Sequence, residues 1–124
     1  NAAHTGADIY LPKIYHEISE IIATYQPNLI GIESLLFQKN VSTAISVAEA
    51  RGIIRLVAAQ NNIPIIESAP NTIKLAVAGS GRAGKAEVTR MVGLLLGIKV
   101  TKKRDDELDA LAVAISTIVT NKNL

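Results

Sequence analysis

The 124-residue sequence has no cysteine and no tryptophan, and it contains a single phenylalanine and a single methionine. Without cysteine the chain forms no disulfide bond, no thiolate zinc site and no cysteine nucleophile, which excludes disulfide scaffolds and zinc fingers. The only histidines are His4 and His16. Any metal ion would therefore be held mainly by carboxylates, which favour a hard, oxygen-binding cation.

Long hydrophobic runs are also missing. No apolar stretch approaches the ~20 residues of a membrane-spanning helix, and the opening Asn-Ala-Ala-His lacks the basic and apolar regions of a signal peptide. We therefore expect a cytoplasmic protein with no membrane partner. Because the first residue is Asn1 and the one methionine is Met91, we also expect the sequence to be a piece of a longer chain.

Aliphatic side chains are abundant. Hydrophobic residues make up 48% of the chain but aromatic residues only 3%, and the mean hydropathy is +0.27. A chain this apolar buries enough surface to offset the entropy lost on folding, so disorder is excluded. The length suits one hydrophobic core, and we predict a single domain over residues 1–124.

The charge is unevenly distributed along the chain. The formal net charge is +2, from 13 basic and 11 acidic residues. Residues 74–104 carry eight of the basic residues and one acid, Glu87, and four acids follow directly: Asp105, Asp106, Glu107 and Asp109. A basic segment beside a group of carboxylates indicates a polyanionic partner with a cation held between them. The alternative is that the basic triplet 102–104 is a solvated loop.

Hydrophobic periodicity predicts alternating helices and strands. Apolar spacings of three and four, with Pro12 in a first turn and Pro27 after the end, predict helices, whereas short apolar runs predict buried strands. The predicted helices cover residues 12–25, 43–60 with Ser42 as its cap, 70–77, 85–96 and 105–119, and the predicted strands cover residues 29–33 and 63–67. A helix-length connection between two buried strands predicts parallel pairing, a right-handed crossover and the α/β class. Because two strands make a marginal sheet, we expect the sheet to be incomplete in this sequence.

Carboxylates stand at the ends of two predicted elements. Glu33 ends the first strand, where ligands collect in open α/β sheets, and burying it requires a partner or a metal ion. Asp106 and Asp109 are three residues apart in the first turn of the last helix, so they share roughly one face. Acids in a first turn also complement the helix dipole, which is the role we assign to Asp105 and Glu107. Asp109 leads into the buried-looking side of its helix, so the dipole accounts for it less well.

The glycine-rich segment Gly79–Lys85 matches two phosphate-binding patterns, G-x-G-x-x-G and G-x-x-x-x-G-K. A nucleotide-binding P-loop needs Ser or Thr after the lysine and a buried strand before the loop, but Ala86 follows the lysine and the preceding segment is predicted to be helical. Arg82 and Lys85 near a helix N-terminus still attract phosphate, including the phosphate backbone of nucleic acid.

The segment Leu35-Leu36-Phe37-Gln38-Lys39-Asn40 holds the only phenylalanine, just after Glu33. Apolar residues in such a connection either pack under the sheet or form a wedge or stacking platform for an unstacked base. Both interpretations stay open from the residues alone.

Several of these residues, taken in order, resemble the RuvC family of Holliday-junction resolvases. The resemblance is carried by Gly31-Ile32-Glu33, Leu36-Phe37, Asn40, Ala50-Arg51-Gly52, Lys74, Lys85 and Asp106-Glu107-Leu108-Asp109-Ala110-Leu111-Ala112. It covers essentially the whole chain, and its specificity comes from the ordered set, because no single motif is decisive.

The resemblance implies a ribonuclease-H-like fold, a mixed sheet flanked by helices. It implies a Mg²⁺-dependent crossover junction endodeoxyribonuclease, with Mn²⁺ as the alternative ion, that cuts four-way DNA junctions in recombination and repair. It also implies a homodimer with helix 43–60 as the contact, and a branch-migration helicase complex as partner. The implied catalytic residues and ligands of two metal ions are Glu33, Asp106 and Asp109. The implied DNA-binding residues are Leu36, Phe37, Lys39, Lys74, Arg82 and Lys85.

This sequence departs from the family pattern at its start and at Leu36. The family's first strand ends in Asp-Pro-Gly and supplies a further carboxylate, and no such strand is found here. We therefore expect an N-terminally incomplete nuclease domain that lacks the first antiparallel strands. Leu36 stands where the family often has Phe, so we expect base stacking to fall to Phe37 alone or to be weaker. The alternative functions are a catalytically inactive DNA-binding and dimerising fragment of the family, and a nucleotide-binding protein that uses Gly79–Lys85.

Overall fold

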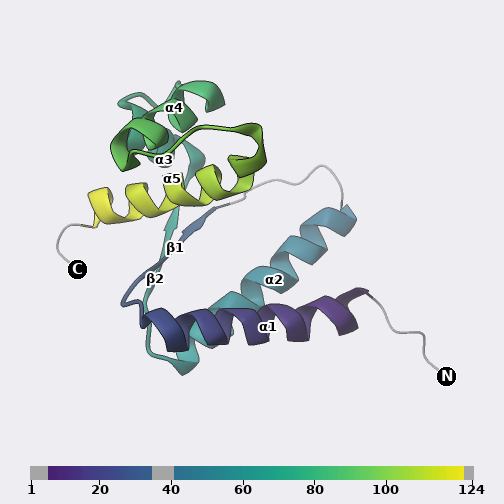
Figure 1. Ribbon diagram of the computed structural model, residues 1–124. Helices are drawn as coiled ribbons and strands as arrows, with labels where there is room; N and C mark the ends of the chain where they lie inside the picture. The colour runs from purple at the N-terminus through teal and green to yellow at the C-terminus, as the bar shows by residue number, and fades with distance from the viewer. Residues whose placement is uncertain (1–5, 35–40, 122–124) are drawn as a thin grey trace. The chain divides into compact units, whose positions relative to one another are not determined.

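The computed structural model describes residues 6–34 and 41–121 of the chain (Figure 1). In chain order the elements are α1 (Gly6–Tyr25), β1 (Ile30–Glu33), α2 (Val41–Gln60), β2 (Ile65–Ser68), α3 (Pro70–Ala78), α4 (Lys85–Leu96), the 3-10 helix η1 (Lys102–Arg104) and α5 (Asp105–Thr120). The chain divides into two compact units, whose described parts are residues 6–30 with 41–65, and residues 31–34 with 66–121. No helix in these described stretches combines the length and the apolar character needed to cross a membrane.

β1 and β2 form a parallel pair, as predicted. The Ile30 N–H donates to the Pro64 carbonyl at 3.1 Å, and the Ser34 N–H donates to the Ser68 carbonyl at 2.8 Å. In both hydrogen bonds the two residues are separated by the same number of positions in the sequence. This constant separation occurs between parallel strands and not between antiparallel ones. The prediction of buried strands was wrong for both: the four residues of β1 are half-buried, and in β2 only Ser68 is buried. The described part of the sheet holds two strands, so within the described residues each strand has one edge that is not paired with another strand.

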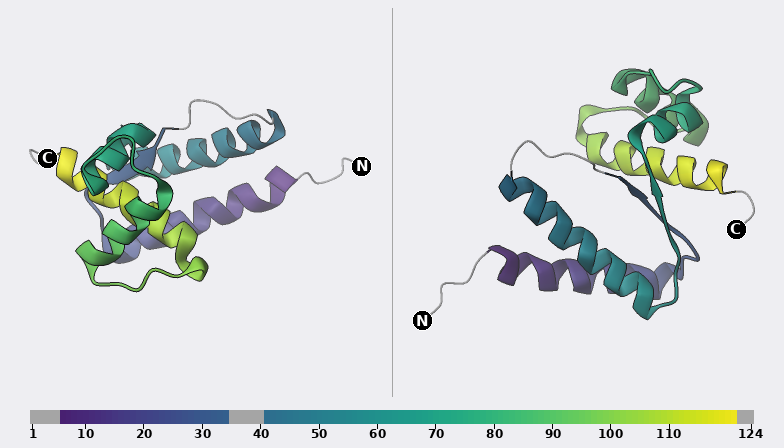
Figure 2. Two further views of the ribbon diagram at one scale, coloured as in Figure 1. Left: turned by 90° about the horizontal axis from the view of Figure 1, so that it is seen from above. Right: turned by 180° about the vertical axis from the view of Figure 1, so that it is seen from behind.

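The first unit is built on the packing of α1 against α2, which run in the same general direction (Figure 2). Two tyrosines of α1 join the helices: the Tyr10 hydroxyl donates to Glu49 Oε1 at 3.2 Å, and the Tyr15 hydroxyl donates to Gln60 Oε1 at 2.7 Å. The buried apolar side chains of this unit are Ile22, Val57 and Ala58.

Both helices of this unit begin earlier than predicted. α1 begins at Gly6, so Pro12 lies inside the helix rather than in its first turn. The helix thus runs through Pro12 despite the cost of a proline in a helix interior, and the turns before Pro12 contact α2 through the hydrogen bond of Tyr10 to Glu49. α2 begins at Val41, which places Ser42 within the helix and not at its cap.

The second unit packs α3, α4 and α5 around a small aliphatic core. Each helix contributes buried residues four apart, the spacing of one helical face. These pairs are Ile73 with Val77, Val88 with Val92, and Leu108 with Ala112. Leu108 is 1% exposed and Val92 is 0% exposed. Because this core packs the three helices against one another, it also sets where the backbone of their first turns lies.

Candidate functional site

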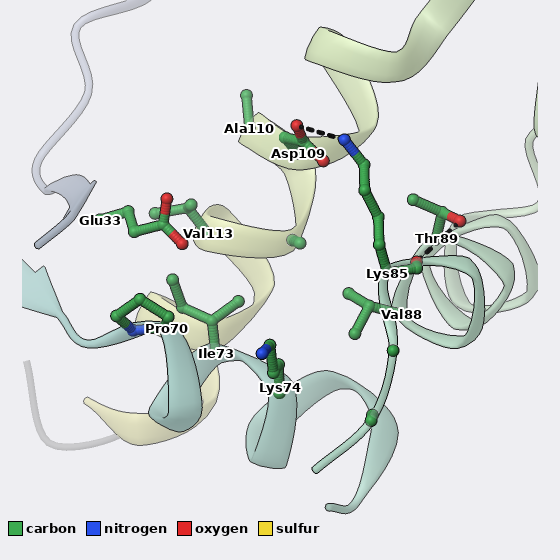
Figure 3. A pocket seen from close by; sticks show the side chains of 13 residues that line it. Glu33, Pro70, Ile73, Lys74, Lys85, Val88, Thr89, Asp109, Ala110 and Val113 are labelled. Atoms are coloured by element: carbon green, nitrogen blue, oxygen red, sulfur yellow. Dashed lines mark hydrogen bonds and ion pairs between the residues drawn. The ribbon is translucent and has the colours of Figure 1, made fainter. Parts of the chain in front are cut away.

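A pocket of about 410 Å³ lies in the second unit. Figure 3 shows four charged side chains around it, each from a different element: Glu33 from β1, Lys74 from α3, Lys85 from α4 and Asp109 from α5. The complete lining is Glu33, Pro70, Ile73, Lys74, Ala83, Gly84, Lys85, Val88, Thr89, Asp109, Ala110, Ala112 and Val113. Several of the apolar members belong to the buried core. The pocket thus combines a rigid apolar base with carboxylates and ammonium groups.

Glu33 holds the last position of β1, as predicted. The hydrogen bond of the next residue, Ser34, to Ser68 of β2 ties down the end of the strand. The side chain is half-buried, and Figure 3 shows its carboxylate beside Val113 of α5. Glu33 and Asp109, which are far apart in sequence, therefore line the same pocket.

Three carboxylates meet at the start of α5. Oxygen atoms of Asp105, Asp106 and Asp109 all lie within 4.8 Å of one another. The helix presents Asp105 and Asp109 on one face because they are four residues apart, and its N-terminal dipole favours negative charge there. Asp106 belongs to this cluster, as expected from its spacing to Asp109, although it does not line the pocket. We call these three residues the α5 carboxylates.

Lys85, the first residue of α4, bridges two of the α5 carboxylates. Its Nζ lies 2.8 Å from Asp105 Oδ2 and 3.2 Å from Asp109 Oδ2 (Figure 3 draws the bond to Asp109). The hydrogen bond with Asp105, and then that with Asp109, raises the pKa of Lys85 above its usual value, so the lysine is charged near neutral pH. All three side chains are about half exposed, at 59%, 49% and 50%. Water therefore weakens this bridge, and it contributes little to stability.

The local structure of α4 holds the backbone of Lys85 in place. Gly84 is the N-cap of the helix. Thr89 is buried, and its hydroxyl lies 3.1 Å from both the Lys85 and the Ala86 carbonyls, between which its donated hydrogen bond is shared. The backbone of the lysine is therefore fixed, while its long side chain keeps the freedom to move its ammonium group.

The other predicted DNA-binding residues fall in three places. Lys74 of α3 is half-buried and lines the pocket. Arg82 is exposed in the connection between α3 and α4, where its N–H donates to Ser80 Oγ at 3.2 Å, and it does not line the pocket. Leu36, Phe37 and Lys39 lie outside the described residues. The structure thus gathers Lys74 and Lys85 with the carboxylates and leaves Arg82 apart.

Sequence reasoning missed the part that Asp105 plays. We assigned this residue to the helix dipole, and it does stand in the first turn of α5. It also makes the shorter of the two contacts to Lys85. The spacing of four between Asp105 and Asp109 was the available signal, because side chains at this spacing can share one cation. The partner was not deducible, because Lys85 comes from another helix.

The segment Gly79–Gly84 connects two helices. Gly79 is the C-cap of α3 and has the left-handed conformation, with φ of 79°, and Gly84 is the N-cap of α4. A P-loop follows a strand, so the geometry does not support the nucleotide-binding interpretation.

Comparison with known proteins gives a consistent result. The family model for "Crossover junction endodeoxyribonuclease RuvC" matches residues 3–117. The protein of that name from Pseudothermotoga lettingae is 49% identical over 104 residues, which cover 84% of this chain and 64% of the relative. Its namesake from Desulfitobacterium hafniense is 47% identical over 113 residues, covering 91% of this chain and 68% of the relative. The chain therefore spans about two thirds of the length of these relatives.

Two solved structures are also similar. A Thermus thermophilus RuvC structure aligns with a TM-score of 0.86 and 26% identity, covering 98% of this chain and 74% of the other. The structure of T. thermophilus RuvC in complex with Holliday junction substrate aligns with a TM-score of 0.87 and 27% identity, covering 97% and 73%. These similarities confirm the predicted ribonuclease-H-like α/β fold.

Proposed function

Because this chain belongs to the RuvC family of crossover junction endodeoxyribonucleases, we propose that it acts in a structure-selective DNA endonuclease. The substrate is a four-way (Holliday) junction formed in recombination and repair, and the reaction is hydrolysis of a phosphodiester bond. The similar T. thermophilus structure solved with Holliday junction substrate supports this choice of substrate.

The observation that carries the proposal is the meeting of Glu33 and Asp109 in one pocket with two lysines. Asp109 also belongs to the α5 carboxylates, and Lys74 and Lys85 line the same pocket. Lysines attract the phosphates of a nucleic acid backbone, and carboxylates would repel them unless cations intervened. The arrangement therefore suits a phosphodiester that is brought to a group of cation-binding carboxylates.

The carboxylates fit the metal ions that the family resemblance implies. Mg²⁺ prefers hard oxygen ligands, and Mn²⁺ accepts the same donors, which makes it the alternative ion. Glu33, Asp106 and Asp109 would hold the two ions. When bound, such ions activate water and stabilise the leaving oxygen in phosphodiester hydrolysis.

The basic residues of the chain bind and orient the DNA. Lys85 stands beside Asp109, so its ammonium group lies where it can contact a phosphate next to the cleaved bond. Lys74 contributes a second positive charge to the pocket, and Arg82 extends the positive surface along the neighbouring connection. We propose that Leu36, Phe37 and Lys39 contact the junction beside the site, with Phe37 stacking on a base.

Symmetric cutting of two strands requires two copies of the site. We propose that the enzyme is a homodimer and that α2 supplies the contact, on the strength of the family resemblance. α2 exposes large apolar side chains, of which Ile45 is 56% and Leu56 is 46% exposed in the single chain. The resemblance also makes a branch-migration helicase complex the proposed partner.

The test is the substitution Asp109→Asn, which keeps the shape of the side chain and removes its charge. We expect nicking of a synthetic four-way junction in Mg²⁺ to fall by more than about 100-fold, because loss of a ligand exceeds the 10- to 100-fold cost of losing a group that merely orients one. Junction binding in EDTA, measured by gel shift, should remain. The matched control is Glu107→Gln, because Glu107 is an exposed acid in the same helical turn and is not one of the α5 carboxylates.

Two outcomes would count against this proposal. Unchanged nicking by Asp109→Asn would exclude its role as a metal ligand, and loss of binding in EDTA would indicate a DNA-binding role. If the unsubstituted chain binds the junction but does not nick it in Mg²⁺, the alternative of a DNA-binding and dimerising fragment is correct.

A further inference from the structure

Asp105 is the one α5 carboxylate to which the proposed function gives no role. It is nevertheless the nearer partner of Lys85, at 2.8 Å, while Asp109 lies 3.2 Å from the same Nζ. One ammonium group therefore forms ion pairs with two carboxylates. Of these, Asp109 lines the pocket and Asp105 does not. The bridge joins the proposed metal site to a residue outside it.

The shared ammonium group competes with a metal ion. A divalent cation on Asp109 would stand close to the Lys85 Nζ, which contacts Asp109 Oδ2, and like charges at such short range repel. Lys85 must then move away from Asp109. Its side chain is 59% exposed, which leaves the ammonium group room for this movement.

From this geometry, and resting on the proposed function, we infer that Asp105 is a positioning residue that holds Lys85 while Asp109 binds the metal ion. Asp105 offers Lys85 an ion pair that does not depend on Asp109. When a metal ion binds Asp109, the lysine can therefore lose its contact with Asp109 and still stay beside the pocket through Asp105. There its ammonium group can contact the phosphate. Without Asp105, the only partner of the Lys85 ammonium in this bridge would be Asp109, and it would compete with the metal ion there.

Two other roles for Asp105 make different predictions. Its oxygen lies within 4.8 Å of those of Asp106 and Asp109, so it could bind the metal directly, and its charge could also raise metal affinity through space. Both of these effects are independent of Lys85. A role in positioning Lys85 must vanish when the lysine is removed, so a double-mutant cycle separates the explanations.

The experiment measures Mn²⁺ binding to the full 124-residue chain by titration calorimetry, without DNA. We expect Asp105→Asn to weaken Mn²⁺ binding about three- to tenfold. This is more than the loss of an exposed ion pair usually causes and less than the loss of metal affinity on removing a group that orients a metal ligand. Lys85→Met should tighten binding, because it removes the competing cation. In the Lys85→Met background, Asp105→Asn should change affinity by less than about twofold. Asp105→Glu, which keeps the charge, should restore most of the affinity.

Glu107→Gln is again the matched control, because it removes one negative charge from the same helical turn. It measures how much the loss of a nearby charge alone lowers the affinity for Mn²⁺. An equal loss of affinity from Asp105→Asn with and without Lys85 would overturn the inference and make Asp105 a ligand or a distant charge. Wild-type affinity in Asp105→Asn would overturn it as well. If the wild-type chain binds no Mn²⁺, the proposed metal-dependent function itself fails, and the inference falls with it.

Discussion

Gly31, in the middle of β1, lies against Thr117 of α5, and its replacement by alanine tests the packing that holds Glu33 in the pocket. A Cβ built on Gly31 would collide with Thr117 Oγ1 and would lie 3.0 Å from Thr117 Cβ. Thr117 is 3% exposed, and its hydroxyl donates to the Val113 carbonyl at 2.7 Å. The threonine is therefore closely packed and hydrogen-bonded at the place that the new methyl group would occupy.

The size of the effect follows from these contacts. Overpacking a filled core costs about 1–3 kcal/mol. If Thr117 rotates to relieve the collision, it gives up its hydrogen bond, which costs about a further 0.5–1.5 kcal/mol. We expect Gly31→Ala to lower the free energy of unfolding by about 2–4 kcal/mol, which corresponds to a fall in Tm of roughly 10–20 °C for a chain of this size.

Urea and thermal unfolding followed by circular dichroism measure this loss. The matched control is Gly52→Ala in α2, where an added Cβ meets nothing within 4 Å in the single chain; because α2 is the proposed dimer contact, both variants are compared at a concentration at which the chain is monomeric. There the same substitution should raise stability by about 0.5–1 kcal/mol, because alanine favours a helix over glycine. A Gly31→Ala variant as stable as the Gly52→Ala variant would refute the packing argument. Adding Thr117→Ala to Gly31→Ala should recover part of the loss, with a coupling of about 1 kcal/mol or more.

Two further predictions concern buried positions of α5. Leu108→Ala should lower the free energy of unfolding by about 2–5 kcal/mol, because the leucine is 1% exposed and its loss leaves a cavity; a loss below about 1 kcal/mol in urea denaturation would contradict its place in the core. Ser116→Ala should leave stability unchanged or raise it by up to about 1 kcal/mol, because the Ser116 hydroxyl is buried with no hydrogen-bond partner among the described residues. A clear loss of stability in Ser116→Ala would indicate that its hydroxyl does have a partner.

The elements that could be predicted from the sequence are those with strong local signals. The helix at 85–96 matches α4 at both ends, because Gly84 and Gly97 bound a clear apolar stripe. The start of α1 was predicted wrongly, because Pro12 by itself indicates a helix start, whereas the helix runs through Pro12 and its first turns contact α2 through Tyr10. Local sequence patterns report the local preferences of the chain. Where tertiary contacts are strong, they override these preferences.

The features of the candidate site also differ in whether the sequence could predict them. Glu33 and Asp109 were predictable, because each stands at a characteristic end of an element, and the structure brings them to one pocket. The sharing of Lys85 between Asp105 and Asp109 was not predictable. It depends on how the start of α4 faces the start of α5, which the core of the second unit decides.

The charges at the start of α5 are better explained by binding than by folding. A half-exposed ion pair contributes about 0–1 kcal/mol, whereas the neighbouring buried Leu108 contributes several times more, so the fold does not depend on the carboxylates. Three carboxylates within 4.8 Å repel one another, and the single ammonium group of Lys85 contacts only two of them. Within this group of four side chains negative charge remains in excess, which a divalent cation would neutralise. Since the ion pair adds little to stability and a cation would relieve the remaining repulsion, these charges support the proposal that Asp106 and Asp109 bind a metal ion while Asp105 holds Lys85.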